Sequence, residues 1–246
     1  SLPTSSGFES VKENIGKVKN KGVDVSASYR LLSGRNGFLN LTASLTSNNN
    51  EIIKLSDAMR AYNERQDALV ASKLNGGRSK PVLRYVEGGS LTSIWAVPSL
   101  GINPQNGKEI YLTPEGEKTY SWKPEYQQIV GNSLEKVRGN FGFNGEYKGF
   151  GLGVVFRYMA GGDYYNQTLV DRVENADLRK NVDRRVLYGR WSEKNKVSPF
   201  KSLKPYNDEA GNYIRAPKTE PTSRFVQKRN ELTLSSISAY YDMHNR

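Results

Sequence analysis

Residues 136–147, KVRGNFGFNGEY, alternate between two kinds of side chain, and this alternation constrains the fold more than any other feature of the chain. Successive side chains of a β-strand point to opposite faces. One face of this segment would be charged or polar. The other would carry apolar or small residues, namely Val137, Gly139, Phe141, Phe143, Gly145 and Tyr147. The segment therefore predicts a strand with one apolar and one polar face.

Four further segments repeat the pattern: residues 22–31, 38–46, 150–158 and a run that starts at Glu231. In the last run the apolar positions change phase after Leu234 and resume at Ile237. A β-bulge, which inserts one extra residue into a strand, produces such a change of phase, and so does a strand that leaves one environment for another. The sequence thus predicts five amphipathic strands, the fifth with a bulge or a change of environment.

Short and long connections alternate between these strands. Residues 33–36 and Lys148-Gly149 are tight turns, whereas roughly 90 and roughly 70 residues make up the other two connections. Outer-membrane barrels have short periplasmic turns and long extracellular loops, and their strands are amphipathic. We therefore expect an all-β fold in which residues 48–135 and 162–229 form extracellular loops of an antiparallel transmembrane barrel.

A soluble antiparallel sheet is the alternative, because its strands alternate in the same way between a core and water. The uneven connections favour the barrel, since soluble sheets have shorter and more even ones. Five strands are too few to close a barrel, which needs about eight. The whole chain, residues 1–246, is therefore expected to be one part of a longer barrel protein.

The composition argues against several other classes of function. The chain lacks cysteine, which excludes disulfides and thiolate metal sites. Its net charge of +11 comes from scattered residues with no compact basic run, so a nucleic-acid partner is not expected. His244 is the only histidine, which argues against a Ser/His/Asp triad or a histidine metal site. We therefore predict no metal and no cofactor.

Enzymatic activity is not expected either. Five acidic residues of the long connections are the candidates for a paired-carboxylate site, namely Glu87, Asp163, Glu174, Asp177 and Asp183. Their spacing is more typical of solvated residues and ion pairs in loops than of a positioned catalytic pair.

The long connections contain local structure and many aromatic residues. Residues 56–72 predict a helix capped by Ser56, and residues 167–179 predict a short one. Aromatic rings stack on sugar rings, which gives five candidate substrate contacts: Trp95, Tyr120, Trp122, Tyr164 and Tyr165. The alternative is that these rings pack the interior of the loops, because loops of this length need a core of their own. For Trp191 packing is the favoured role.

Five segments resemble the SusC/RagA family of TonB-dependent outer-membrane transporters, in the order and spacing that the family shows. These segments are residues 14–29, 87–120, 147–169, 181–191 and 222–242. The resemblance implies the late strands of a 22-stranded barrel, with a signal peptide, a plug domain and further strands outside this sequence. It also implies a cell outer-membrane location, import of oligosaccharides or peptides, and no cofactor. The implied partners are a SusD-like surface lipoprotein and TonB, which would act through the absent N-terminal part.

The alternation and the resemblance agree on which side chains face lipid. The expected lipid-facing residues are Val137, Phe141, Phe143, Tyr147, Leu152, Val154 and Phe156. The alternative function is a soluble or cell-surface carbohydrate-binding β-domain without a role in transport. In that case a second sheet would cover the same aromatic face.

Overall fold

The structure is a computed structural model that describes residues 16–71, 79–207, 211, 213, 214 and 218–243. Its contacts divide the chain into two compact units. We call Asn20–Asn49, Gly131–Asn166 and Phe225–Arg246 the sheet unit, and Ser1–Lys19, Asn50–Val130 and Gln167–Arg224 the loop unit. His244 lies outside the described residues.

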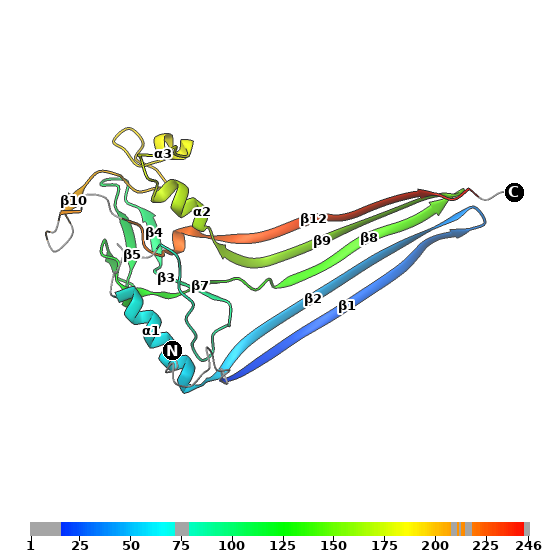
Figure 1. The fold of residues 1–246 in the computed structure, drawn as a ribbon, viewed down its shortest axis with the longest axis horizontal. Coiled ribbons are helices and arrows are strands. Elements are labelled where there is room, and N and C mark those ends of the chain that lie inside the picture. Colours follow the sequence, from blue (N-terminus) through cyan, green and yellow to red (C-terminus); the bar gives the residue numbers. More distant parts are fainter. Residues whose placement is uncertain (1–15, 72–78, 208–210, 212, 215–217, 244–246) are drawn as a thin grey trace, which may run out of the picture. The chain divides into compact units, whose positions relative to one another are not determined.

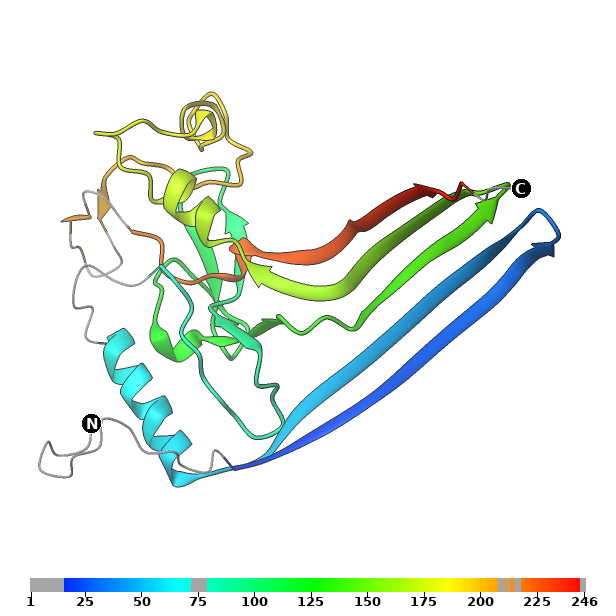
Figure 2. The same cartoon turned by 45° about the vertical axis from the view of Figure 1, so that its right-hand side comes forward.

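Five long strands form one sheet in the order β1-β2-β8-β9-β12, and they lie side by side in both views (Figure 1, Figure 2). The strands are β1 (Gly16–Gly34), β2 (Gly37–Leu55), β8 (Val137–Tyr147), β9 (Phe150–Tyr165) and β12 (Val226–Tyr241). The pairs β2–β8, β8–β9 and β9–β12 are antiparallel. All five predicted strands are present, so the all-β antiparallel fold is confirmed.

The β8–β9 turn has the backbone that a two-residue hairpin requires. Lys148 and Gly149 have φ angles of 50° and 87°, both in the left-handed region. A type I′ turn needs positive φ at both central residues, and its twist matches that of the flanking strands. The dipeptide therefore explains why these strands pair without a longer loop.

Several strands extend beyond their alternating segments and into the ranges 48–135 and 162–229. β2 continues to Leu55, β9 continues to Tyr165, and β12 begins at Val226. Near the end of β2, Ile52 donates a backbone hydrogen bond to the Gly89 carbonyl and accepts one from Gly88 N–H, each 2.8 Å long. Hydrogen bonds to distant residues thus prolong the strand, and alternation within a short window does not reveal them.

The loop unit contains short elements around its own apolar core. These elements are α1 (Asp57–Ala71), β3 (Ser93–Ala96), β4 (Ser99–Ile102), β5 (Glu109–Leu112), β6 (Lys118–Thr119), a 3₁₀ turn η2 (Pro124–Tyr126), β7 (Gln128–Asn132), α2 (Gln167–Leu169), a π-helical turn η3 (Val170–Glu174), α3 (Arg184–Tyr188), β10 (Tyr206–Asn207), β11 (Tyr213–Ile214) and a 3₁₀ turn η4 (Ser223–Phe225), which runs into the sheet unit. Small sheets pair β3 with β7, join β4, β5 and β6, and pair β10 with β11. Buried residues of the core include Ile94, Ala96, Val97, Val170 and Val173.

The helix at 56–72 is confirmed, since α1 spans Asp57–Ala71 and the Met59 amide donates to Ser56 Oγ at 3.3 Å. The helix predicted over 167–179 is too long: α2 and η3 together end at Glu174. The reason lies in Asn175, whose side-chain amide exchanges two hydrogen bonds with the backbone of Thr219. Among the described residues, no helix combines the length and apolar character needed to cross a membrane.

Candidate functional site

Neighbouring strands of the sheet unit bring their apolar side chains to one side. Directly opposed residues of antiparallel strands project to the same face. Phe143 lies opposite Leu41 and Val154, and Phe141 lies opposite Ala43 and Phe156. The Phe141 and Phe156 rings are stacked with centroids 5.2 Å apart.

We call this side the apolar sheet face. It carries Leu39, Leu41, Leu45, Val137, Phe141, Phe143, Tyr147, Phe150, Leu152, Val154, Phe156, Tyr158, Leu232, Leu234, Ile237, Ala239 and Tyr241. All seven predicted lipid-facing residues therefore share one face. Much of this face is open: Tyr147, Phe150 and Ile237 are 62%, 67% and 62% exposed.

A bulge in β12 keeps its apolar residues on this face. Leu234 pairs with Phe156 and Ser236 pairs with Val155, so β12 has one residue more than β9 over this step. Beyond the bulge, Ile237 lies opposite Val154. Without the extra residue, the second half of β12 would turn its apolar side chains to the opposite face. Of the two explanations for the change of phase, the bulge is confirmed.

The opposite side, the polar sheet face, carries amides, hydroxyls and charges in register. Ser44, Asn140, Arg157 and Thr233 form one row across β2, β8, β9 and β12. In another row the Tyr240 hydroxyl donates to Glu146 Oε2 at 2.8 Å, across β9. A Cβ atom on Gly151 would lie 2.1 Å from the Tyr240 ring, so glycine is needed where that ring crosses the strand.

A second bulge places Tyr164 on the polar sheet face. Arg229 pairs with Gly162 and Glu231 with Met159, so the extra residue here is in β9, beside Gly161 with its φ of 83°. Tyr164 consequently lies opposite Gln227, and its hydroxyl donates to Gln227 Oε1 at 2.7 Å. Tyr164 is 40% exposed, which leaves part of its ring available for contact.

The other aromatic candidates are separate from one another in their contacts. Trp95 is 8% exposed and lies under the Arg84 guanidinium, 5.3 Å from its ring centroid. The Trp122 indole N–H donates to the Pro221 carbonyl at 3.1 Å. The Tyr120 hydroxyl accepts a 2.6 Å hydrogen bond from Asn103, and the Tyr165 ring meets Phe225 edge-on at 6.1 Å. No described contact brings these side chains into one site.

Trp191 has the packing role that was expected. It is 9% exposed, and its indole N–H donates to the Pro104 carbonyl at 2.9 Å. A Cβ atom on Gly107 would lie 2.5 Å from its ring, which shows how tightly residues 104–107 cover the indole.

The loop unit contains a buried ionic cluster that the sequence did not reveal. Arg224 donates from Nε and Nη2 to the two carboxylate oxygens of Glu109, at 3.1 and 2.8 Å, and Nη2 also pairs with Glu174. The Glu109 and Glu174 side chains are 2% and 0% exposed. Thr219 Oγ1 donates to Glu174 at 3.0 Å. The cluster thus joins two connections that are far apart in sequence.

Two more buried cations lie around these carboxylates. Arg190 is 6% exposed and donates to the carbonyls of Val173, Glu174 and Lys201. Burial lowers the pKa of Lys201 to about 8, although Glu174 and Glu109 oppose this change. Burial also acts to lower the pKa of Arg224, but Glu109 and Glu174 outweigh it and raise this pKa. Burial acts to raise the pKa of Glu109, but Arg224, together with hydrogen bonds from Ser99 and Thr222, outweighs it, so this pKa is lowered overall.

Lys201 makes the stability of the loop unit depend on pH. In the unfolded chain this lysine has its ordinary pKa of about 10.4. Between pH 8 and about pH 10.4 the Lys201 side chain is therefore mostly neutral in the folded chain and protonated in the unfolded chain. The free energy of unfolding therefore rises with pH across this window. Lys201→Met is expected to remove the rise and to stabilise the loop unit below pH 8 by about 3 kcal/mol. Pulse proteolysis in urea, performed on the intact protein at several pH values, measures both effects.

Lys204→Met is the matched control, because Lys204 is exposed and pairs with the exposed Glu193. It is expected to change neither the pH dependence nor the stability by more than a few tenths of a kcal/mol. A Lys201→Met variant that keeps the wild-type rise above pH 8 would contradict the role given to Lys201.

The other acidic candidates pair with neighbouring cations. Hydrogen bonds from Arg179 and Arg185 lower the pKa values of Asp177 and Asp183, each to about 2. Asp163 pairs with Lys228 at 2.7 Å, and Glu87 pairs with Arg60 at 3.2 Å. Within the described part of the chain, no three histidine or carboxylate side chains gather as a metal site.

The chain resembles known proteins both in sequence and in structure. No protein-family model matches the chain. The TonB-dependent receptor P39 of Formosa agariphila is 22% identical over 237 residues, which covers 82% of this chain and 22% of that protein. The TonB-dependent receptor P3 of the same bacterium is 27% identical over 191 residues, which covers 69% of the chain and 18% of the relative.

Solved structures with the same fold include the RagAB peptide transporter, with a TM-score of 0.68 and 20% identity over 98% of this chain. The RagAB peptide importer in its "closed-closed" state has the same TM-score and 22% identity. The chain corresponds to 24% of each matched structure and about a fifth of each curated relative. The expected resemblance in sequence and fold is therefore confirmed.

Proposed function

Because the chain is similar to SusC/RagA-type TonB-dependent receptors in sequence and fold, we propose that it is the late-strand portion of an outer-membrane transporter barrel. The observation that carries this proposal is the division of the sheet into an exposed apolar face and a polar face, in register across four strands. The strands of a transmembrane barrel are divided in this way between lipid and an aqueous interior.

In this proposal the apolar sheet face contacts lipid. Val137, Phe141, Phe143, Tyr147, Leu152, Val154 and Phe156 are the residues predicted to do so. Their exposure to water would be unfavourable, at about 25 cal/mol for each Å² of apolar surface, and lipid removes that cost. The row of Asn140 and Arg157 would face the barrel interior, which in such proteins is polar.

The loop unit, in the same proposal, lies outside the cell as an ordered extracellular structure. Its apolar core and its buried ionic cluster support this, because they give the two long connections a defined conformation. Tyr120 and Tyr164 are the most exposed of the five predicted substrate contacts, at 37% and 40%. Trp95 and Trp122 would act mainly by supporting the loops, and Tyr165 by packing against Phe225 within the sheet unit.

The proposed cargo is an oligosaccharide or a peptide, delivered with a SusD-like surface lipoprotein and driven by TonB. The RagAB structures are those of a peptide transporter, which makes peptides the better-supported class. Exposed tyrosines suit both classes, since their rings stack on sugars and pack against peptide side chains.

Uptake by cells that lack the full-length gene tests the proposal. Cells with the gene restored are expected to take up one pool, fluorescent peptides or fluorescent oligosaccharides, at least tenfold faster than cells without it. Collapsing the proton gradient should abolish this difference, because energy reaches the receptor through TonB. Equal uptake of both pools with and without the gene would refute the proposed function.

A further inference from the structure

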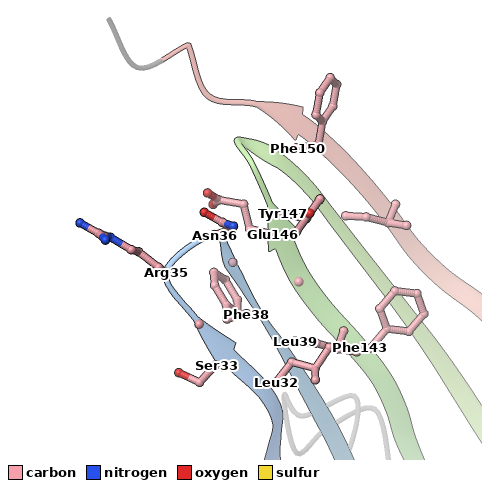
Figure 3. Close-up of a pocket in the computed structure, with 14 residues that line it drawn as sticks. Leu32, Ser33, Arg35, Asn36, Phe38, Leu39, Phe143, Glu146, Tyr147 and Phe150 are labelled. Carbon is pink, nitrogen blue, oxygen red and sulfur yellow. The ribbon is translucent and has the colours of Figure 1, made fainter. Parts of the chain in front are cut away.

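The sheet unit and the loop unit each expose large apolar side chains. In the sheet unit these belong to the apolar sheet face, which includes a hollow lined in part by Tyr147 and Phe150 (Figure 3) and which the proposed function assigns to lipid. In the loop unit, Leu187, Tyr188 and Val197 are 67%, 73% and 85% exposed. Lipid contact does not account for these three, because the same proposal puts the loop unit outside the cell.

Leu187 and Tyr188 lie on the exposed side of the short helix α3 (Figure 1). Positions three and four apart are neighbours on a helix surface, so Arg184 shares this side with both residues. The Arg184 guanidinium lies 5.6 Å from the ring centroid of Tyr188. Val186 is buried and attaches the helix to the loop unit. The helix thus presents two apolar side chains and a cation outward.

The segment that follows α3 brings Val197 to the end of this helix. The Asn195 side-chain amide donates to the Tyr188 carbonyl at 3.4 Å, and the Ser198 hydroxyl donates to the Gly189 carbonyl. Val197 lies between these two attached residues, and two exposed lysines flank Asn195. We call the exposed residues of both segments the α3 patch: Arg184, Leu187, Tyr188, Lys194, Lys196 and Val197.

The α3 patch has an excess of positive charge. Arg184, Lys194 and Lys196 form no ion pair with any residue that the structure describes. Hydrogen bonding to Lys204 is the main cause of the lowered pKa of Glu193, and Lys196 adds only a smaller attraction. Each acidic side chain between residues 175 and 204 pairs with a cation outside the patch: Asp177 with Arg179, Asp183 with Arg185, and Glu193 with Lys204.

The shape of the α3 patch suits a folded protein better than a small cargo molecule. A small ligand is usually held between walls that bury most of its surface, whereas Tyr188 and Val197 project with most of their own surface open. Exposed apolar side chains rimmed by polar residues are typical of protein–protein interfaces. Unpaired cations at the rim favour a partner with an acidic surface, because like charges placed opposite each other are unfavourable.

We propose that the α3 patch docks an acidic face of the SusD-like surface lipoprotein, an inference that rests on the proposed function and gives that partner a contact surface. Leu187, Tyr188 and Val197 contact apolar side chains of the lipoprotein. The three cations of the patch pair with carboxylates around this contact, which fixes the orientation of the two proteins.

Photo-crosslinking in living cells tests the contact. The intact protein carries p-benzoylphenylalanine in place of Tyr188, and the product that forms on illumination is identified by mass spectrometry. The expected product is a surface lipoprotein joined through a segment rich in aspartate and glutamate. A product with another protein, a product with lipopolysaccharide alone, or no product overturns the docking surface.

Lys194→Glu/Lys196→Glu tests the part played by charge. This change is expected to lower the yield of crosslinked lipoprotein at least fivefold, because it places like charges opposite each other. Hydrogen exchange over residues 186–200 should match the wild type, since both lysines are exposed and unpaired within the described part of the chain.

Lys80→Glu/Lys118→Glu is the matched control. Both lysines are exposed, belong to the loop unit and form no ion pair among the described residues. The control is expected to keep the yield of crosslinked lipoprotein within twofold of the wild type. Equal yields from the two double variants would show that charge at the α3 patch does not recognise the partner.

Uptake separates this inference from the proposed function. Cells that import cargo but give no lipoprotein product at position 188 refute the docking surface alone. Cells that give the lipoprotein product but import neither pool refute the proposed transport and leave the docking surface in place.

Discussion

Arg224→Ala is expected to destabilise the loop unit by about 3–5 kcal/mol, the usual cost of removing one partner from a buried ionic cluster. The substitution leaves Glu109 and Glu174 buried, with their side chains 2% and 0% exposed, and without their shared guanidinium. Lys201 and Arg190 remain nearby, but neither has the bidentate geometry by which Arg224 holds Glu109. The two long connections would consequently lose their common attachment.

Hydrogen exchange in the intact protein measures this effect. Peptides from residues 93–112 and 170–200 are expected to lose protection by roughly a hundredfold or more, since each 1.4 kcal/mol is a factor of ten. Arg185→Ala is the control, because Arg185 forms an exposed pair with Asp183 and should matter by less than about 1 kcal/mol. Equal protection in the two variants would show that the buried cluster is not a main source of loop stability.

Phe141→Arg is expected to cost about 2–4 kcal/mol of barrel stability if position 141 lies near the middle of the bilayer. The neighbouring change Asn140→Arg introduces the same side chain on the polar sheet face, opposite Ser44 and Arg157. It is expected to cost much less, because a hydrated interior accommodates charge. Phenylalanine favours strands and asparagine does not, but strand propensities span only about 1 kcal/mol, so a larger difference between the two variants reports the surroundings of each face.

Urea unfolding of the intact protein in lipid bilayers, followed by gel mobility, compares the two variants. Refolding the wild type with and without lipid or detergent decides between the barrel and the soluble carbohydrate-binding domain. A soluble domain would bury Phe141 under a second layer and would fold without lipid or detergent. If both variants unfold at the wild-type urea concentration, the apolar sheet face does not contact lipid.

The amino-acid sequence by itself determined the strands of the sheet unit and their two faces. Alternation is a local property, because successive side chains of a strand point to opposite faces, so each side chain's face follows from whether its position is odd or even. For the same reason the change of phase after Leu234 indicated where β12 is irregular, and the strand register identifies the irregularity as a bulge. The helix cap at Ser56 and the turn at Lys148-Gly149 could also be predicted from the sequence, since capping and turn formation depend on a few adjacent residues.

Only the tertiary structure decided which distant residues meet. Glu109, Glu174 and Arg224 resemble ordinary loop charges in the sequence, yet folding brings them together in the interior of the loop unit. The bulge beside Gly161 moves Tyr164 to the polar sheet face, and Asn175 ends a helix by pairing with Thr219. Each of these outcomes depends on contacts between segments far apart in the chain, and neither periodicity nor propensity within one segment contains that information.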